Sequence, residues 1–125
     1  MEGISTDLVN VIKDYIIFKP KTKKELEEAV NLWYNNMEKA YKIYGHISDW
    51  DTSLITDMSR LFEDMSYFND NINNWDVSSV TNMRYMFFGA ISFNQRLDSW
   101  DVSSVDDMAY MFCCTSKFNK NINSW

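Results

Sequence analysis

The sequence predicts an α/β repeat fold, a solenoid in which every 25-residue coil contributes a short strand and a short helix, with an N-terminal helical cap. Three observations support this prediction. Tryptophan recurs every 25 residues from position 50 to position 125, the apolar spacing changes within each repeat, and an amphipathic helical stripe precedes the first repeat. The chain of 125 residues is 46% hydrophobic and 16% aromatic, which is enough apolar material for one folded domain.

Three complete repeats follow one another without a gap, at residues 50–74, 75–99 and 100–124. Each repeat holds a tryptophan, an aspartate, a serine, a methionine, two phenylalanines and an asparagine in the same seven columns. A single repeat cannot bury its own apolar face, so we expect stacked coils to share one core. We also expect the asparagine column, Asn69, Asn94 and Asn119, to form a ladder that satisfies backbone groups of neighbouring coils.

The apolar period changes within each repeat. Leu97, Trp100 and Val102 match the L-x-x-L-x-L core of a leucine-rich repeat, where alternate side chains of a short strand point inward. Either Ser78 or Ser79 is then the expected N-cap. A helical stripe follows, formed by Val80, Met83, Met86, Phe87 and Ala90. The repeat is therefore predicted to be leucine-rich-repeat-like.

Residues 1–45 are the predicted helical cap, and residues 46–125 are the predicted solenoid. Thr22 and Glu25 form a capping box that begins a helix, and Gly45 is its expected C-cap. One apolar face, interrupted at Asn35-Asn36, is formed by Leu26, Val30, Trp33, Met37, Tyr41 and Tyr44. A shorter helix is predicted at residues 5–15.

The charge of the chain argues against nucleic acid as a partner. The net charge is −6, and residues 46–125 carry the whole acidic excess. No apolar run approaches the roughly 18 residues of a membrane span, so no membrane insertion is expected. The N-terminus lacks the order of a signal peptide. These features predict a location in the cytoplasm of the producing cell or in a virion.

Six polar residues are expected to face outward in rows beside the inward strand positions. Their role is either to close turns or to form a line of carboxylates that binds a basic protein partner or a cation. These residues are Asp51, Asp76, Asp101, Ser53, Ser78 and Ser103. Tyr85 and Tyr110 lie off the helical stripe and add contact area to the predicted partner surface. No calcium loop or zinc-ligand spacing occurs, so no metal or other cofactor is expected.

A second predicted contact lies at the end of the repeats. The chain stops at Trp125, where a fourth repeat would begin, and leaves a face with Phe118, Ile122 and Trp125 open. Two explanations stay open at this point. Either the polypeptide is a fragment of a longer array, or this face contacts another chain, including a second copy of itself.

The repeats resemble those of the BspA-like leucine-rich-repeat surface proteins. The resemblance rests on Trp75-Asp-Val-Ser-Ser-Val and Trp100-Asp-Val-Ser-Ser-Val, each followed by Met-x-x-Met-Phe and later by Phe-Asn. It covers about residues 18–125. Such repeats occur in mycoplasmas and other bacteria, in protists and in large DNA viruses, and the resemblance implies a role in adhesion and protein–protein contact.

These observations predict a non-catalytic protein–protein interaction module. The alternatives are a structural or assembly component of a particle or surface layer, for example a giant-virus virion, and an adhesion protein that lacks its export signal. An enzyme is not expected, because the sequence offers no nucleophile–base pair, no glycine-rich phosphate loop and no metal-ligand spacing.

Overall fold

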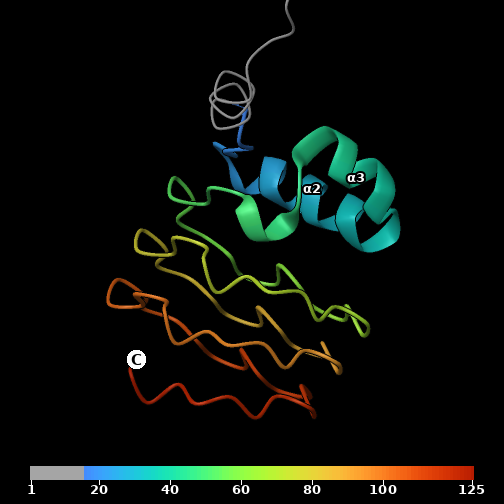
Figure 1. Ribbon diagram of the computed structural model, residues 1–125. Helices are drawn as coiled ribbons and strands as arrows, with labels where there is room; N and C mark the ends of the chain where they lie inside the picture. The colour runs from blue at the N-terminus through green and yellow to red at the C-terminus, as the bar shows by residue number, and fades with distance from the viewer. Residues whose placement is uncertain (1–15) are drawn as a thin grey trace, which may run out of the picture.

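The computed structural model describes residues 16–125, so the helix predicted at residues 5–15 lies outside the described residues. Two α-helices, α2 (Lys23–Asn35) and α3 (Met37–Tyr44), precede the 3₁₀ turn η1 (Ile47–Asp49). The rest of the chain forms three loops that lie one above another, with the helices at one end (Figure 1). We call residues 50–74 loop 1, residues 75–99 loop 2 and residues 100–124 loop 3.

Helix α2 begins and ends where the sequence predicts. The Thr22 side chain accepts a hydrogen bond from the Glu25 N–H at 3.1 Å and so caps the first turn. At the other end, the Asn36 side chain accepts from the Lys39 N–H at 3.2 Å and starts α3. The predicted interruption at Asn35-Asn36 is confirmed, because Asn36 closes one helix and caps the next.

The interruption divides the apolar stripe of the cap. In α2 the predicted core residues Leu26, Val30 and Trp33 are buried. In α3, by contrast, Met37 is 51% exposed and Tyr41 is 57% exposed. The expectation of a single apolar face across both helices is therefore wrong for α3, since the new helix start turns these side chains away from the loops.

The predicted strand-plus-helix solenoid is wrong. Among the described residues, those from 50 to 125 contain no α-helix and no extended strand. Only two isolated parallel bridges occur there, Asp57 with Asn82 and Asn82 with Asp107. The leucine-rich-repeat-like α/β class must therefore be replaced by irregular loops built from successive turns.

Hydrogen bonds between loops explain why the predicted repeat helix does not form. Alternate N–H groups of loop 1 leave their own loop, whereas a helix would use them for carbonyl groups four residues earlier. These N–H groups belong to Met58, Arg60, Phe62 and Asp64, which donate at 2.7–2.9 Å to the carbonyl oxygens of Asn82, Arg84, Met86 and Phe88. Arg60 and Asp64 have left-handed φ angles of 60° and 59°, which also exclude a continuous right-handed helix.

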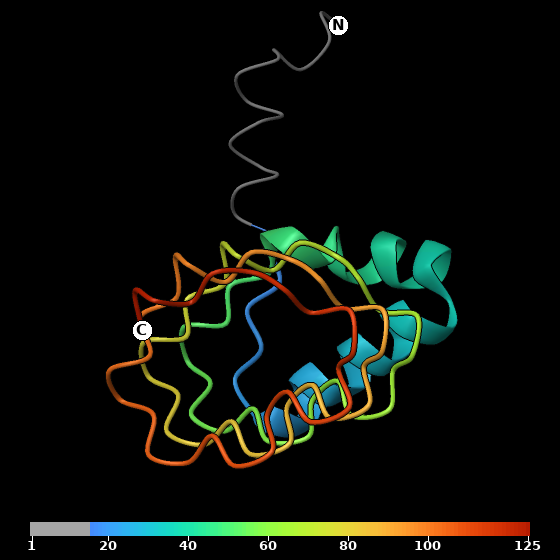
Figure 2. The same cartoon turned by 90° about the horizontal axis from the view of Figure 1, so that it is seen from below.

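The prediction of which apolar side chains of the repeats are buried is nevertheless confirmed. Val80, Met83, Met86, Phe87 and Ala90, which were assigned to a helical stripe, are all fully buried. Equivalent rings stack across the loops, since Phe87 lies 5.3 Å from Phe62 and 5.6 Å from Phe112 between ring centroids. Figure 2 shows the three loops superimposed, as this stacking requires. The 25-residue spacing therefore predicts side-chain depth but not backbone path.

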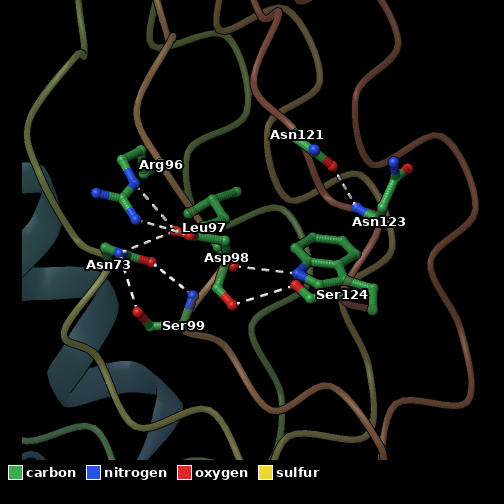
Figure 3. A network of polar contacts seen from close by, with 9 residues as sticks. Asn73, Arg96, Leu97, Asp98, Ser99, Asn121, Asn123 and Ser124 are labelled. Atoms are coloured by element: carbon green, nitrogen blue, oxygen red, sulfur yellow. Dashed lines mark hydrogen bonds and ion pairs between the residues drawn. The ribbon is translucent and has the colours of Figure 1, made fainter.

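Polar side chains also join the loops. The predicted asparagine ladder is confirmed: Asn69 Oδ1 accepts from the Asn94 N–H at 2.8 Å, and Asn94 Oδ1 accepts from the Asn119 N–H at 3.0 Å. A second set of contacts lies four residues further along the loops, where Asn73 bonds to both Asp98 and Ser99 (Figure 3). Each contact satisfies polar groups that the turns leave unpaired.

Candidate functional site

The predicted aspartate–serine row is present, and each aspartate closes its own turn. Asp76 Oδ1 accepts from the N–H of Ser78 at 2.9 Å and from its hydroxyl at 2.6 Å. The same arrangement joins Asp101 to Ser103, at 3.0 Å and 2.6 Å, and Asp51 to the N–H of Ser53 at 2.9 Å. The geometry is that of Asx turns, which gives the row a structural role.

The electrostatics of this row differ along its length. Hydrogen bonds from Ser53, together with Lys19, lower the pKa of Asp51, and hydrogen bonds from Ser103 lower the pKa of Asp101. Lys19 Nζ lies 3.8 Å from Asp51. Among residues 16–125, no basic side chain forms an ion pair with Asp76 or Asp101, so the row keeps net negative charge.

Acid should destabilise the protein through these carboxyl groups. Their pKa values are lowered on folding, so near pH 4 and below the unfolded chain binds more protons than the folded chain. Stability should therefore be constant above about pH 5 and fall as the pH drops through the lowered pKa values. Urea midpoints measured between pH 7 and pH 3 test this. The double variant Asp51→Asn/Asp101→Asn should flatten the slope, and parallel curves for variant and wild type would contradict it.

The two predicted tyrosines stack on each other and on arginines. Tyr85 and Tyr110 have ring centroids 5.0 Å apart at an interplanar angle of 13°. The Arg60 guanidinium lies 4.2 Å from the Tyr85 centroid, and that of Arg84 lies 5.6 Å from the Tyr110 centroid. The Tyr85 ring is thus contacted by both Tyr110 and Arg60, and the Tyr110 ring by Tyr85 and Arg84. Sequence reasoning missed the two arginines, because they occupy different columns of the repeat.

A larger apolar surface lies on the cap, at residues that sequence reasoning assigned to a buried helix face or did not single out. Three adjoining hollows follow α3, with volumes of about 440, 360 and 360 Å³. The first shares Trp33 and Met37 with the second, and the second shares Tyr41, Lys42 and His46 with the third. We call this continuous surface the cap groove. The helix interruption at Asn36 was the sequence signal that could have revealed it.

The walls of the cap groove are held in place by specific contacts. The Tyr34 hydroxyl accepts from the N–H of Tyr67, at 3.3 Å, and so ties α2 to loop 1. Trp33 donates its indole N–H to Asp70 at 2.9 Å and packs edge-on against His46 at 4.9 Å between ring centroids. The groove is therefore a preformed surface.

The cap groove continues into an acidic hollow. Ile17 and Asp49 line both the last hollow of the groove and a further one of about 660 Å³. The walls of that hollow also include Asp51, Ser53 and Asp76. The structure thus brings two members of the predicted aspartate row to the end of an apolar channel, a juxtaposition that the sequence did not reveal.

The third group of predicted residues lies elsewhere. Phe118, Ile122 and Trp125 are half-buried at the end of the stack opposite the helices (Figure 1). Trp125 lies 6.3 Å from Trp100 between ring centroids and donates its indole N–H to the Leu97 carbonyl at 3.0 Å. These residues do not meet either the aspartate row or the two tyrosines.

Two kinds of feature are absent from the described part of the chain. No group of three or more histidine, cysteine, aspartate or glutamate side chains in residues 16–125 is placed to hold a metal ion. Over the same residues, no helix has the length and apolar character needed to cross a membrane.

Comparison with protein families matches residues 28–125 to the family described as "Mycoplasma protein of unknown function, DUF285". The chain belongs to the DUF285 family. No curated protein and no solved structure matches it. The DUF285 match starts within α2 and includes α3 and all three loops, so it contains most of the cap groove and the whole aspartate row.

Proposed function

We propose that this DUF285 protein is a non-catalytic module that binds another protein through the cap groove. The observation that supports the proposal is the exposure of large apolar side chains along the whole cap groove. Met37, Tyr41 and Tyr67 are 51%, 57% and 85% exposed, and all three line the groove. Contiguous apolar patches on a protein surface mark interaction sites far more often than scattered exposed residues do.

The residue types of the cap groove support protein recognition. Tyrosine, tryptophan and methionine are enriched in protein interfaces. The aromatic side chains contribute large contact areas with few rotatable bonds, and methionine is flexible enough to fit partners of different shape. In the middle hollow of the cap groove, the side chains of Glu38 and Lys42 pair with each other at 3.4 Å, so their opposite charges cancel there. An apolar segment of a partner therefore fits the middle of the groove.

The acidic hollow specifies the partner further. Asp49, Asp51 and Asp76 face a single cation there, Lys19. A partner segment with apolar side chains followed by a basic end would match the groove and the hollow together. In this proposal, the predicted aspartate row lies at the rim of the binding site and not at its centre.

Charged substitutions in the cap groove test the proposal. We expect Met37→Asp/Tyr41→Asp to weaken partner binding at least ~10-fold, since both side chains lie at the centre of the contact. The matched control is Ile91→Asp, which replaces a side chain of similar exposure (45%) outside the groove. Proteins captured from host extract by the wild type and by the control, but not by the double variant, would support the proposal. Equal capture by all three would contradict it.

We also propose that the 25-residue repeat is of the BspA-like class. The segment Trp75-Asp-Val-Ser-Ser-Val and its equivalent in loop 3 support this closer placement. Members of that class are associated with adhesion and protein contact, which agrees with an interaction module. The proposal concerns the repeat sequence, because the backbone is not the strand-plus-helix coil expected of a leucine-rich repeat.

A further inference from the structure

Loop 3 carries both cysteines of the chain, Cys113 and Cys114, next to each other in the sequence. Both are exposed free thiols, and their sulfur atoms lie 3.5 Å apart. Neither cysteine lines the cap groove or the acidic hollow. The pair is therefore a chemically reactive group that the proposed function does not use.

The turn that holds the pair is set by the fold and not by the cysteines. Cys114 has a left-handed φ of 61°, and the equivalent residues of loops 1 and 2, Asp64 and Gly89, have φ of 59° and 72°. The left-handed region suits glycine and aspartate better than cysteine. Since the same turn forms with all three residue types, the backbone presents the two thiols in a preset geometry.

Hydrogen bonds hold the chain on both sides of the pair. The Cys113 carbonyl accepts from the Gly89 N–H at 3.0 Å, and the Cys113 N–H donates to the Tyr110 carbonyl at 3.3 Å. The hydroxyl of the buried Thr115 donates to the Phe87 carbonyl at 2.8 Å. These bonds restrict the backbone, so a ligand that fits the existing geometry binds with little loss of conformational entropy.

Solvent reaches this column even where a further loop follows. In loop 1, which loop 2 covers, Asp64 is exposed and Glu63 is half-buried. In loop 2, which loop 3 covers, Phe88 and Gly89 are both half-buried. Access to the two cysteines therefore comes with their column and does not depend on the position of loop 3 in the stack.

The distance between the sulfur atoms suits a single atom bound to both. With two bonds of about 2.3 Å, the length of a zinc–thiolate bond, the separation of 3.5 Å corresponds to an angle of about 100° at the bound atom. A disulfide needs a distance of about 2.05 Å between the sulfurs and usually joins Cα atoms at least about 4.4 Å apart. Adjacent residues have Cα atoms only about 3.8 Å apart, so the existing geometry favours chelation over a disulfide.

The number of ligands indicates the kind of atom that fits. Within residues 16–125, no group of three or more histidine, cysteine, aspartate or glutamate side chains is placed to hold a metal ion. A structural zinc ion takes four protein ligands, so two thiols do not complete its site. Trivalent arsenic forms three bonds in a pyramid, with angles close to the one found above. An organic arsenical keeps one bond to carbon, and two thiols supply the other two.

We propose that Cys113 and Cys114 form a preset binding site for trivalent arsenic compounds, in which both sulfur atoms bind one arsenic atom. With phenylarsine oxide, the two S–H bonds and the arsenic–oxygen bond break, and two As–S bonds form. The oxygen leaves as water with both thiol protons. Arsenic and sulfur keep their oxidation states, so the step needs neither an oxidant nor a reductant.

The test uses the whole reduced chain and phenylarsine oxide at neutral pH. Because the chain has no other cysteine, thiol titration and intact mass count the bound arsenic directly. We expect one arsenical per chain and the loss of both titratable thiols. Dithiothreitol should release the arsenical, whereas an equal thiol concentration of glutathione should not. A chain that gains no arsenical, or that only loses two hydrogens as a disulfide forms, would overturn the proposal.

Matched variants separate chelation from simple thiol reactivity. Cys113→Ser and Cys114→Ser each leave one thiol and should weaken binding at least ~100-fold, since the second bond is then no longer intramolecular. Ser116→Ala changes a nearby exposed residue and should leave binding unchanged.

A synthetic peptide of residues 110–117 tests the preset geometry, because it carries both cysteines without the stacked loops. It should bind phenylarsine oxide at least ~10-fold more weakly than the whole chain does. Equal affinity of peptide and chain, or of a single-cysteine variant and the wild type, would overturn the proposal.

Discussion

Phe87→Ala is expected to lower the free energy of unfolding by about 3–5 kcal/mol, the usual loss for a fully buried phenylalanine. Phe87 has no exposed surface and stacks on Phe62, Phe93 and Phe112, with ring centroids 4.2–5.6 Å apart. The cavity would lie at the centre of the stack, where loops above and below cannot close it without losing their shared register. Since small domains have a total stability of about 5–15 kcal/mol, the variant should be near the limit of folding.

The matched control is Phe112→Ala, which removes the same ring from the same column of loop 3. Phe112 is half-buried, so less apolar surface is lost and solvent can fill the space. We expect a cost of about half that of Phe87→Ala. Urea denaturation of both variants, followed by tryptophan fluorescence, measures the difference. Equal costs would mean that this column is not buried more deeply in loop 2 than in loop 3, as the structure requires.

The second large effect is expected for Trp75→Phe, at about 2–4 kcal/mol. Trp75 is 2% exposed, and its indole N–H donates to the Ile47 carbonyl at 2.8 Å in a buried contact that joins loop 2 to the cap. Phenylalanine keeps an aromatic ring but cannot donate, and it also leaves part of the indole volume empty. The loss should appear both in the urea midpoint and in faster amide exchange of η1.

Trp125→Phe controls for the change of ring. Trp125 makes the equivalent bond to Leu97 at 3.0 Å, but it is half-buried, so water can replace the missing donor. Its expected cost is below ~1 kcal/mol. If Trp75→Phe proved as mild as Trp125→Phe, the indole hydrogen bonds would not couple the cap to the loops.

In the cap, local sequence signals predict where the helices begin and end but not which of their apolar side chains are exposed. Thr22 and Glu25 predict the start of α2, and Asn36 predicts its end, because capping depends on residues within four positions of each other. The exposure of Met37 and Tyr41 could not be predicted in this way. It depends on the direction in which α3 leaves Asn36, where the non-helical backbone angles (φ −153°, ψ 81°) break the helix.

In the candidate sites too, the sequence singles out individual residues, whereas only the structure shows which residues lie next to them. The sequence predicts an outward aspartate row because its columns flank inward strand positions, and it singles out the two tyrosines because they lie off the apolar stripe. It did not predict that Asp51 and Asp76 lie beside Asp49 at the end of an apolar channel, nor that Arg60 covers Tyr85. Asp76 follows Asp51 by 25 residues, and Tyr85 follows Arg60 by 25 residues. Only the stacking of one loop on the next brings these pairs together.

By itself, the sequence determined the register of the repeats, the buried columns and the asparagine ladder. A strict 25-residue period places the same side chain at the same depth in each loop, whatever path the backbone follows. Only the tertiary structure decided that path. Apolar steps of three residues suit a succession of turns as well as a helix, and the N–H groups of Met58 and Arg60 bond to carbonyls 24 residues away. Such bonds between loops repay the left-handed φ angles that a local pattern gives no reason to expect.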